Sequence, residues 1–407
     1  MAAPLLKNRD IVFVGLQAWD VEIGSNAKNL AMEMARHNRV MFVTPPLDRI
    51  TAYKSKNNPS IQRMSRVLQG KEPSLTKVGD SLWNLLPDCM LESINWISSP
   101  FIFDSLNKIN NRRYANAIAK GIKELGFKDV ILFNDNDIFR SFHLKELLKP
   151  AVSLYYSRDY LLAVNYWRRH GERLEPKLIA KSDAVVANST YLAEYARQYN
   201  PHSYYVGQGC DLEMFDSAKI TGPPPSDIAA LTGNPAKPII GYVGAILSLR
   251  LDRLVLEYIA ANKPDWQLVL VGPEDPAFAN SDLHKMTNVH FTGRKDGTEL
   301  PAYINSFDVC INPQILNEVT IGNYPRKVDE YLAMGKPVVA TKTKAMEVFA
   351  EHCYLATDKE SYVTEISRAL TENNSQKALA RINFAGSHTW ENNTAEIYKT
   401  IQKVETE

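Results

Sequence analysis

The feature that most constrains this chain is an alternation of short apolar runs with amphipathic helical segments, which occurs twice along its 407 residues. The first series begins at residues 11–15, where four apolar residues and a glycine predict a strand buried on both faces. A helical pattern over 25–37 and another apolar run at 40–43 complete a β-α-β opening. Such an opening predicts a parallel sheet with helices on both faces.

The alternation is interrupted once. Residues 216–238 are rich in proline and glycine, which disfavour both helix and strand, and we interpret them as a linker. Strands are expected before this linker over 130–133, 152–156, 184–187 and 203–206, and after it over 239–244, 267–272, 289–291, 309–311 and 337–340.

The sequence therefore predicts two doubly wound α/β domains, as the chain length also suggests. The predicted parts are an N-terminal domain over 1–215, the linker over 216–238, a C-terminal domain over 239–385 and a C-terminal amphipathic helix over 386–407. We expect that helix to pack back toward the N-terminal domain.

Composition narrows the function classes. A net charge of +1 gives no indication of nucleic-acid binding. We expect a cytoplasmic protein, because the sequence contains neither a signal peptide nor a membrane-length apolar run and its four cysteines are widely spaced.

The most informative segment is residues 323–341, with the sequence NYPRKVDEYLAMGKPVVAT. Pro325 suits the first position of a helix, and Gly335 suits its end. A helix start at the carboxyl edge of a sheet offers free N–H groups, to which Lys327 adds a charge, so the pair suits a diphosphate. Glu330 lies on the same helical face and suits the paired hydroxyls of a ribose. The alternative is an ordinary exposed Lys–Glu pair.

This segment resembles the donor-binding signature of the family 4 glycosyltransferases (GT4, group 1 type), which have the GT-B fold of two Rossmann-like domains facing across a cleft. The resemblance extends over nearly the whole chain because other segments follow in the family's order. These segments are residues 182–189, 206–211, 241–245, 266–273, 288–293, 300–303 and 307–309.

The resemblance implies that Lys327 contacts the donor diphosphate and Glu330 the nucleotide ribose, with Gly244 allowing close backbone approach. It also implies a metal-independent, retaining transfer from a UDP- or GDP-sugar to a saccharide or lipid-linked acceptor, for cell-surface polysaccharide. The further residues expected to line the nucleotide are Ala245, Gly272, Pro273, Gly293, Tyr324, Pro325 and Arg326.

The N-terminal domain is expected to supply the acceptor side. Gly24, Ser25 and Asn26 are expected to face the reacting sugar, Ser25 and Asn26 being suited to a helix N-cap. Trp19 and Asp20 are candidates for lining the acceptor site, although Trp19 equally suits packing at the rim. Asp159 is a candidate for positioning the acceptor hydroxyl.

The sequence departs from the family pattern at two positions. Gly322 stands where many members have a glutamate that touches the transferred sugar, and Glu318 is the nearest substitute. Ala245 stands where many have an arginine, and Arg250 is our choice for the second phosphate contact. These departures keep two alternatives open: a non-catalytic sugar-nucleotide or carbohydrate-binding partner, and a sugar-nucleotide 2-epimerase on the same fold.

Two further patterns in the N-terminal half have competing interpretations. Residues 135–137 match D-x-D, a metal–nucleotide motif, but we favour a turn at a strand end. The basic stretch 49–77 and the aromatic stretch 91–103 suit either an anionic membrane surface or a solvated loop beside a buried helix. His170 is interpreted as a surface residue.

Overall fold

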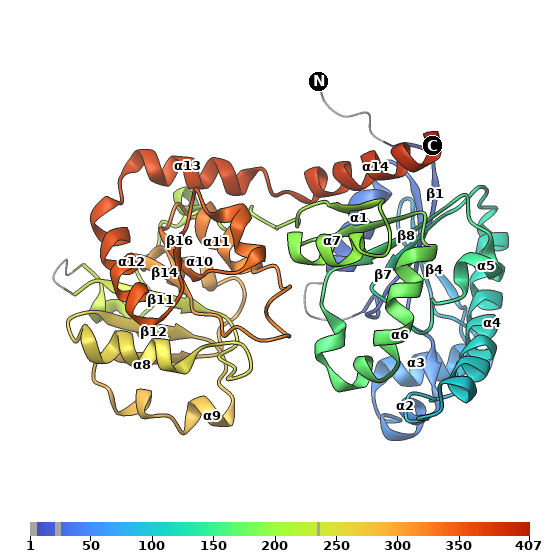
Figure 1. The fold of residues 1–407 in the computed structure, drawn as a ribbon, viewed down its shortest axis with the longest axis horizontal. Helices are drawn as coiled ribbons and strands as arrows, with labels where there is room; N and C mark the ends of the chain where they lie inside the picture. Colours follow the sequence, from blue (N-terminus) through green and yellow to red (C-terminus); the bar gives the residue numbers. More distant parts are fainter. Residues whose placement is uncertain (1–5, 21–25, 234–236) are drawn as a thin grey trace. The chain divides into compact units, whose positions relative to one another are not determined.

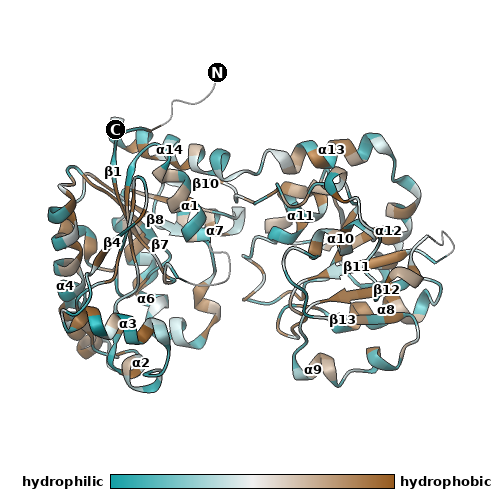
Figure 2. Cartoon of the chain, turned by 180° about the vertical axis from the view of Figure 1, so that it is seen from behind, coloured by the Kyte–Doolittle hydropathy of each residue, from teal (hydrophilic) through white to brown (hydrophobic). Residues whose placement is uncertain are grey.

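The computed structural model describes residues 6–20, 26–233 and 237–407, which form two compact units (Figure 1). Unit 1 comprises the residues up to Gly207 together with Trp390–Glu407, and unit 2 comprises Gln208–Thr389. The chain thus passes between the units twice. Both units are sheets covered by helices, and the central strands of both sheets are largely hydrophobic (Figure 2).

Unit 1 contains an eight-stranded sheet in the order β10-β9-β8-β7-β1-β2-β5-β4. All neighbouring pairs are parallel except β4 and β5, which form an antiparallel hairpin at one edge. A separate two-stranded sheet pairs β3 with β6. The strands are β1 (Asp10–Val14), β2 (Arg39–Val43), β3 (Leu47–Asp48), β4 (Leu75–Gly79), β5 (Leu82–Leu85), β6 (Met90–Leu91), β7 (Ile131–Asp135), β8 (Val152–Ser157), β9 (Ala184–Ala187) and β10 (Ser203–Tyr205).

Helices cover both faces of this sheet. The longest, α4, is preceded by Ser99 and ends at Gly126, whose left-handed φ of 61° and N–H bonds to the last turn terminate it. The C-terminal helix α14 packs on the same core as α1, where Ile397 and Tyr398 are buried with Phe13. The helices are α1 (Asn26–Ala35), α2 (Arg49–Lys54), α3 (Pro59–Leu68), α4 (Pro100–Leu125), α5 (Leu144–Leu148), α6 (Asn165–Lys181), α7 (Thr190–Arg197) and α14 (Trp390–Thr406).

Unit 2 contains a six-stranded, wholly parallel sheet in the order β13-β12-β11-β14-β15-β16. Numbered within the unit this order is 3-2-1-4-5-6, which is the order of a Rossmann fold. The strands are β11 (Ile239–Val243), β12 (Gln267–Val271), β13 (Val289–Gly293), β14 (Val309–Asn312), β15 (Val338–Thr341) and β16 (Tyr354–Ala356).

The helices of unit 2 are α8 (Arg253–Asn262), α9 (Pro276–Ala279), α10 (Leu300–Asn305), α11 (Arg326–Ala333), α12 (Lys359–Glu372) and α13 (Ser375–Gly386). They divide the core into two clusters, one on each face of the sheet. Gly241 in the middle of β11 leaves room for the ring of Phe307, since a Cβ there would lie 2.0 Å from a ring carbon. Among the helices of the described ranges, none combines the length and apolarity needed to cross a bilayer.

The observed boundaries differ from the sequence prediction in several respects. The C-terminal helix begins at Trp390 rather than at residue 386. Residues 208–215 belong to unit 2 rather than to the N-terminal domain. The described part of 216–238 is not a free linker, because Ile228 is fully buried in the core of unit 2 beside Phe215 and Ile239. Ile220 and Leu231, which lie in the same segment, pack against the same core. The hairpin β4–β5 and strand β16 were not predicted.

Candidate functional site

The candidate site of unit 2 lies at the carboxyl edge of its sheet, around the ends of β11 and β14. These two strands are adjacent, and the strand order runs in opposite directions on either side of them. Ligands of open α/β sheets bind at such a switch point. The segments that leave the edge there are residues 244–252 after β11 and residues 313–325 after β14, which leads into α11.

Two glycines shape this edge. Gly244 has a φ of 138°, and a Cβ there would lie 2.7 Å from Lys327 Nζ. Gly272 has a φ of 151°, and a Cβ there would lie 2.0 Å from the carbonyl oxygen of Gly244. Both backbone angles are strained for any other residue, and both positions lack space. The turns after β11 and β12 therefore pack directly against each other.

Lys327 lies in the first turn of α11 and reaches the end of β11. Its ammonium group lies 3.9 Å from the ring centroid of Tyr242 and donates a hydrogen bond to the Tyr242 hydroxyl. That hydroxyl in turn donates to the Ala245 carbonyl, 3.1 Å away. The lysine charge is thus held beside Gly244, where an anion could accept from it. The Gly244 N–H itself donates to the Val271 carbonyl at 2.9 Å.

Glu330 lies one turn further along α11. Arg326 Nε lies 3.3 Å from its Oε1, and its side chain is 14% exposed. Burial raises the pKa of Glu330, while the charges of Arg326 and Lys327 oppose that rise. The ionised Glu330 carboxylate, which is largely buried, can accept hydrogen bonds from two neighbouring hydroxyls.

Helix α11 is anchored on its other side by Asp329, a residue that the sequence reading overlooked. Asp329 is fully buried, and three side chains donate to it or share a hydrogen bond with it. Tyr324 Oη and Cys210 Sγ lie 2.8 and 3.3 Å from Oδ2, and His388 Nδ1 lies 2.6 Å from Oδ1. Cys210 and His388 come from the two ends of unit 2, where the Cys210 N–H also donates to the His388 carbonyl. Only the tertiary fold joins these residues.

The other residues expected around the nucleotide are distributed along the same edge. Tyr324 is buried, Arg326, Ala245 and Pro273 are exposed, and Gly293 ends β13 with a φ of 71°. Pro325 is the N-cap of α11 rather than its first helical residue, a shift of one position. Gly335 ends the helix with a φ of 72°, as predicted.

The sequence departs from the family pattern in the two segments that follow β11 and β14. Gly322 is buried and Glu318 is exposed, both within the segment between β14 and α11. Arg250 is exposed on the segment after β11, and its carbonyl accepts from the N–H of Ile315 at 2.9 Å. Arg250 and Glu318 therefore both lie on segments that border the switch point.

In unit 1, Asp159 belongs to a charged cluster at the carboxyl edge. Arg158 donates to Asp135 Oδ1 at 2.7 Å through Nε and to Asp159 Oδ2 at 2.8 Å through Nη1. Asp135 is fully buried, whereas the Asp159 side chain is 43% exposed. These two carboxylates keep the Arg158 guanidinium charged by raising its pKa against the opposing effect of burial. Asp159 is thus positioned by a fixed cation and open to solvent.

The structure confirms the turn interpretation of the D-x-D segment. Asp137 Oδ1 accepts from the N–H groups of Phe139 and Arg140 at 3.2 and 3.0 Å, which is an Asx turn. His170, expected at the surface, is instead buried and stacked on Phe103 at a centroid distance of 3.7 Å. The expectation was wrong because neighbouring arginines suggested exposure, while His170 faces inward from α6.

The predicted acceptor residues of the first loop have mixed positions. Trp19 packs edge-on against Phe42 and carries Lys28 over its ring, so it packs at the rim of the core. Asp20 is exposed and accepts from Ser60 Oγ at 3.0 Å. Asn26 is the first residue of α1. Gly24 and Ser25 lie outside the described residues.

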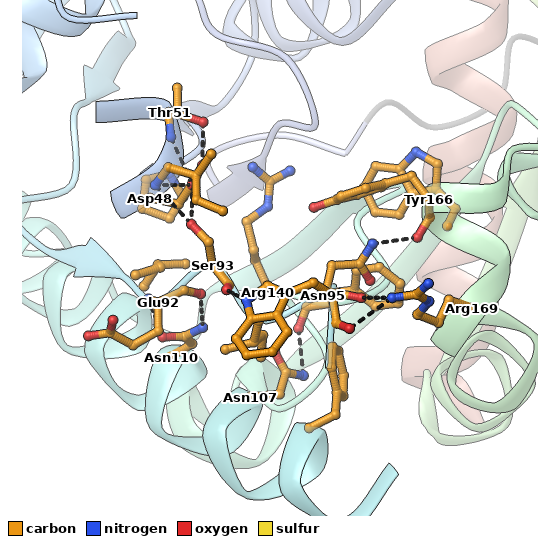
Figure 3. A pocket seen from close by; sticks show the side chains of 18 of the residues that line it. Asp48, Thr51, Glu92, Ser93, Asn95, Asn107, Asn110, Arg140, Tyr166 and Arg169 are labelled. Atoms are coloured by element: carbon orange, nitrogen blue, oxygen red, sulfur yellow. Dashed lines mark hydrogen bonds between the residues drawn. The ribbon is translucent and has the colours of Figure 1, made fainter. Parts of the chain in front are cut away.

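A pocket of about 690 Å³, which the sequence did not predict, lies within unit 1 (Figure 3). It is bordered by the segments that follow β1, β2 and β7, by β6 and the loop after it, and by α4 and α6. Aromatic and polar side chains share its walls, and Arg140 extends into it between Asp48 and Tyr166 (Figure 3). The clue in the sequence was the aromatic content of 91–103, which suited either a membrane surface or a buried helix beside a solvated loop.

Residues 237–372 match the family described as Glycosyl transferases group 1. TuaH of Bacillus subtilis, named as a teichuronic acid biosynthesis glycosyltransferase, is 30% identical over 41% of the chain. A phosphatidyl-myo-inositol mannosyltransferase of Propionibacterium freudenreichii is 24% identical over 61% of it. These alignments cover 42% and 62% of the two relatives.

Solved structures with the same fold cover nearly the whole chain. Sucrose-phosphate synthase from Thermosynechococcus elongatus has a TM-score of 0.64 at 16% identity, covering 97% of this chain and 99% of its own. A UDP-forming trehalose-phosphate synthase from Burkholderia vietnamiensis has a TM-score of 0.67 at 11% identity, covering 98% and 100%. Anabaena HepE, solved with UDP and glucose, has a TM-score of 0.59 at 17% identity, covering 96% and 99%. The predicted GT-B fold, with two Rossmann-like domains, is confirmed.

Proposed function

We propose that this chain, whose residues 237–372 are a group 1 glycosyltransferase domain, transfers a sugar from a UDP- or GDP-sugar to a saccharide or lipid-linked acceptor. The proposal includes retention of the anomeric configuration and a role in cell-surface polysaccharide synthesis. The name of the B. subtilis relative supports that role.

One observation carries the proposal: Lys327 Nζ and the Gly244 backbone meet at the end of β11, with Glu330 one turn along α11. A donor diphosphate beside Gly244 would accept from the Lys327 ammonium, which lies in the first turn of α11. The ribose would then give two hydroxyl hydrogen bonds to Glu330. Anabaena HepE, which has the same fold, was solved with UDP, and this supports a nucleoside diphosphate ligand here.

The chemistry follows from where negative charge develops. As the bond from the anomeric carbon to the diphosphate oxygen breaks, the diphosphate gains charge, and a fixed Lys327 stabilises that charge without reorganisation. Arg250 is the second cation that we assign to the diphosphate. The acceptor hydroxyl attacks from the face that the leaving group departs, and the departing phosphate takes its proton. Asp159, held by Arg158, orients that hydroxyl.

We further propose that unit 1 binds the inner face of the plasma membrane peripherally. Tyr53 on α2 and Phe101 on α4 are 83% and 81% exposed, and α2 and α3 carry the basic stretch. Part of that charge is paired, since Glu92 binds Arg49 and Glu72 binds Arg66. Binding to vesicles with and without phosphatidylserine tests this: equal binding to both would contradict an anionic membrane contact.

The first test of the function is the thermal midpoint of the purified chain with UDP, GDP, ADP, TDP and NAD. A ligand that binds the folded state raises the midpoint by mass action. We expect UDP or GDP to raise it in the wild type but not in Glu330→Ala. A rise with NAD alone would overturn the donor site.

Product analysis then separates the proposed transfer from its alternatives. Incubation of the preferred UDP- or GDP-sugar without acceptor should return the sugar unchanged apart from slow hydrolysis. A new epimer of the sugar would identify a 2-epimerase instead. Tight nucleotide binding with no turnover for any acceptor extract would identify a non-catalytic partner.

A further inference from the structure

The pocket of unit 1 is a binding site that the donor chemistry does not use, and we infer that it holds an uncharged saccharide, the sugar end of the acceptor. This inference rests on the proposed function, because the saccharide is assigned there as the acceptor. It goes beyond that function in naming the pocket, the residues that recognise the sugar and the charge class of the ligand.

Arg140 supplies the donors of the pocket. Its Nε donates to Asp137 Oδ2 at 2.6 Å, and Asp137 is almost fully buried, so the head of the arginine is fixed at one point. Its two terminal nitrogens have no hydrogen-bond partner among the residues that the structure describes, and they extend into the pocket (Figure 3). A guanidinium presented in this way can donate to two neighbouring oxygens of one ligand.

Asp48 supplies an acceptor beside it. Its Oδ1 accepts from the N–H groups of Ile50 and Thr51 and from Ser93 Oγ, whereas its Oδ2 accepts only from Thr51 Oγ1 among the described residues. Burial alone would raise the pKa of Asp48, but the hydrogen bonds from Ser93 and Thr51 hold it below the usual range. Asp48 is therefore a carboxylate with remaining acceptor capacity on one oxygen.

Aromatic rings complete the walls. Trp96, Tyr166 and Trp167 line the pocket together with Phe139, and Trp96 is fixed at its rim by a hydrogen bond from Nε1 to the Ser93 carbonyl at 2.8 Å. Trp96 and Tyr166 remain 69% and 56% exposed. Ring faces of this kind bind the apolar C–H face of a sugar, while their edges tolerate water.

The combination selects an uncharged polyol. A hydroxyl both donates and accepts, so adjacent sugar hydroxyls can accept from the Arg140 fork and donate to Asp48. A carboxylate or phosphate can only accept, so it has no proton to donate to Asp48. It would also add negative charge near Asp48 and Asp137, of which Arg140 neutralises one. The other cation that lines the pocket, Arg169, donates to the Asn95 and Trp96 carbonyls. The volume of about 690 Å³ lies in the range of small-molecule sites.

The test measures saccharide binding by tryptophan fluorescence, because two of the six tryptophans line the pocket. The probes are glucose, galactose, mannose, N-acetylglucosamine, maltose and cellobiose as uncharged sugars, with glucuronic acid and glucose 6-phosphate as acidic ones. We expect at least one uncharged sugar to bind with a Kd of about 1 mM and the acidic ones to bind at least tenfold more weakly, about 1.4 kcal/mol of discrimination.

Variants assign the binding to the pocket. Trp96→Ala should weaken it about fivefold through the lost ring contact. Arg140→Lys keeps a charge beside Asp137 but removes the fork, and it should weaken binding about tenfold. Tyr199→Ala is the matched control, since Tyr199 is an exposed aromatic of unit 1 that does not line the pocket, and it should bind as the wild type does.

The outcomes separate this inference from the proposed function. Glu330→Ala should abolish the nucleotide-induced rise in thermal midpoint and leave saccharide binding intact. Trp96→Ala should leave that rise intact and weaken saccharide binding about fivefold. The inference is overturned if no uncharged sugar binds while UDP or GDP still does, or if the acidic sugars bind as well or better. It is also overturned if Trp96→Ala and Tyr199→Ala behave alike. Absence of nucleotide binding would instead count against the donor site alone.

Discussion

The two units carry their polar residues at the carboxyl edges of similar sheets, yet they assemble them in opposite ways. In unit 2, Lys327 and Glu330 come from one helix. Gly244, at the end of β11, makes room for Lys327, and Gly272, at the end of β12, makes room for the Gly244 turn. In unit 1, the pocket draws residues from segments that are far apart in sequence, such as Asp48, Trp96 and Arg140.

This difference shows which kind of site a sequence can reveal. A site on a single helix has a fixed spacing, so its residues form a recognisable motif. A site assembled from several loops has no spacing that the chain itself sets. If unit 2 depends on such a motif, substitutions in α11 should affect sugar transfer most. Substitutions of the residues that hold α11 and the glycine turns in place should affect mainly stability.

The largest effect is expected at Lys327. Lys327→Ala should lower kcat/KM for sugar transfer about a thousandfold, because the diphosphate loses the fixed charge that meets it as it departs. The matched control is Lys359→Ala: that lysine starts α12, after the edge strand β16 and three strands away from β11, where it lies over Tyr258 at 5.0 Å. Its loss should leave the rate unchanged. Equal effects of the two substitutions would show that the lysine–tyrosine pair is only structural.

The next largest effect is expected at Asp329, whose buried hydrogen bonds hold α11 in place. Asp329→Ala leaves Tyr324, Cys210 and His388 without their shared acceptor and should lower the free energy of unfolding of unit 2 by about 3 kcal/mol. Hydrogen exchange of the α11 amides, compared with those of α4 in unit 1, measures this directly. Unchanged protection of α11 would mean that the cluster does not hold the helix.

A smaller effect is expected from the contact between the Gly272 and Gly244 turns, which can be separated from the cost of a positive φ. Gly272→Ala places a Cβ 2.0 Å from the Gly244 carbonyl and should destabilise the chain by about 2 kcal/mol more than Gly293→Ala does. Gly293 also has a positive φ, but a Cβ there would meet no atom within 4 Å, so only the backbone cost remains. Denaturant titrations of both variants give the difference. Similar midpoints would show that the two turns can move apart.

The smallest expected effect is the pH dependence of donor binding. Glu330 must be ionised to accept the ribose hydroxyls, and burial raises its pKa, so donor KM should begin to rise at a pH above the usual range for glutamate. Below that pKa, KM should increase about tenfold per pH unit. The Glu330→Gln variant should lose this limb of the profile. A wild-type profile identical to that of Glu330→Gln would remove the carboxylate from donor binding.

The sequence by itself determined both doubly wound sheets, the C-terminal helix and the compact motif around Lys327 and Glu330. It could do so because apolar runs of strand length and residues at helical spacing are local properties of the chain. Even the bounds of α11 were predicted to within one residue from Pro325 and Gly335.

Only the tertiary structure decided the rest. It joined Asp329 to Cys210 and His388, buried Ile228 within the supposed linker, turned His170 inward and formed the pocket around Arg140. In each case the partners are separated by many residues, and their proximity results from packing of whole elements rather than from any local preference. Local spacing therefore predicts the motif of α11, whereas contacts between distant residues form the Asp329 cluster and the pocket of unit 1.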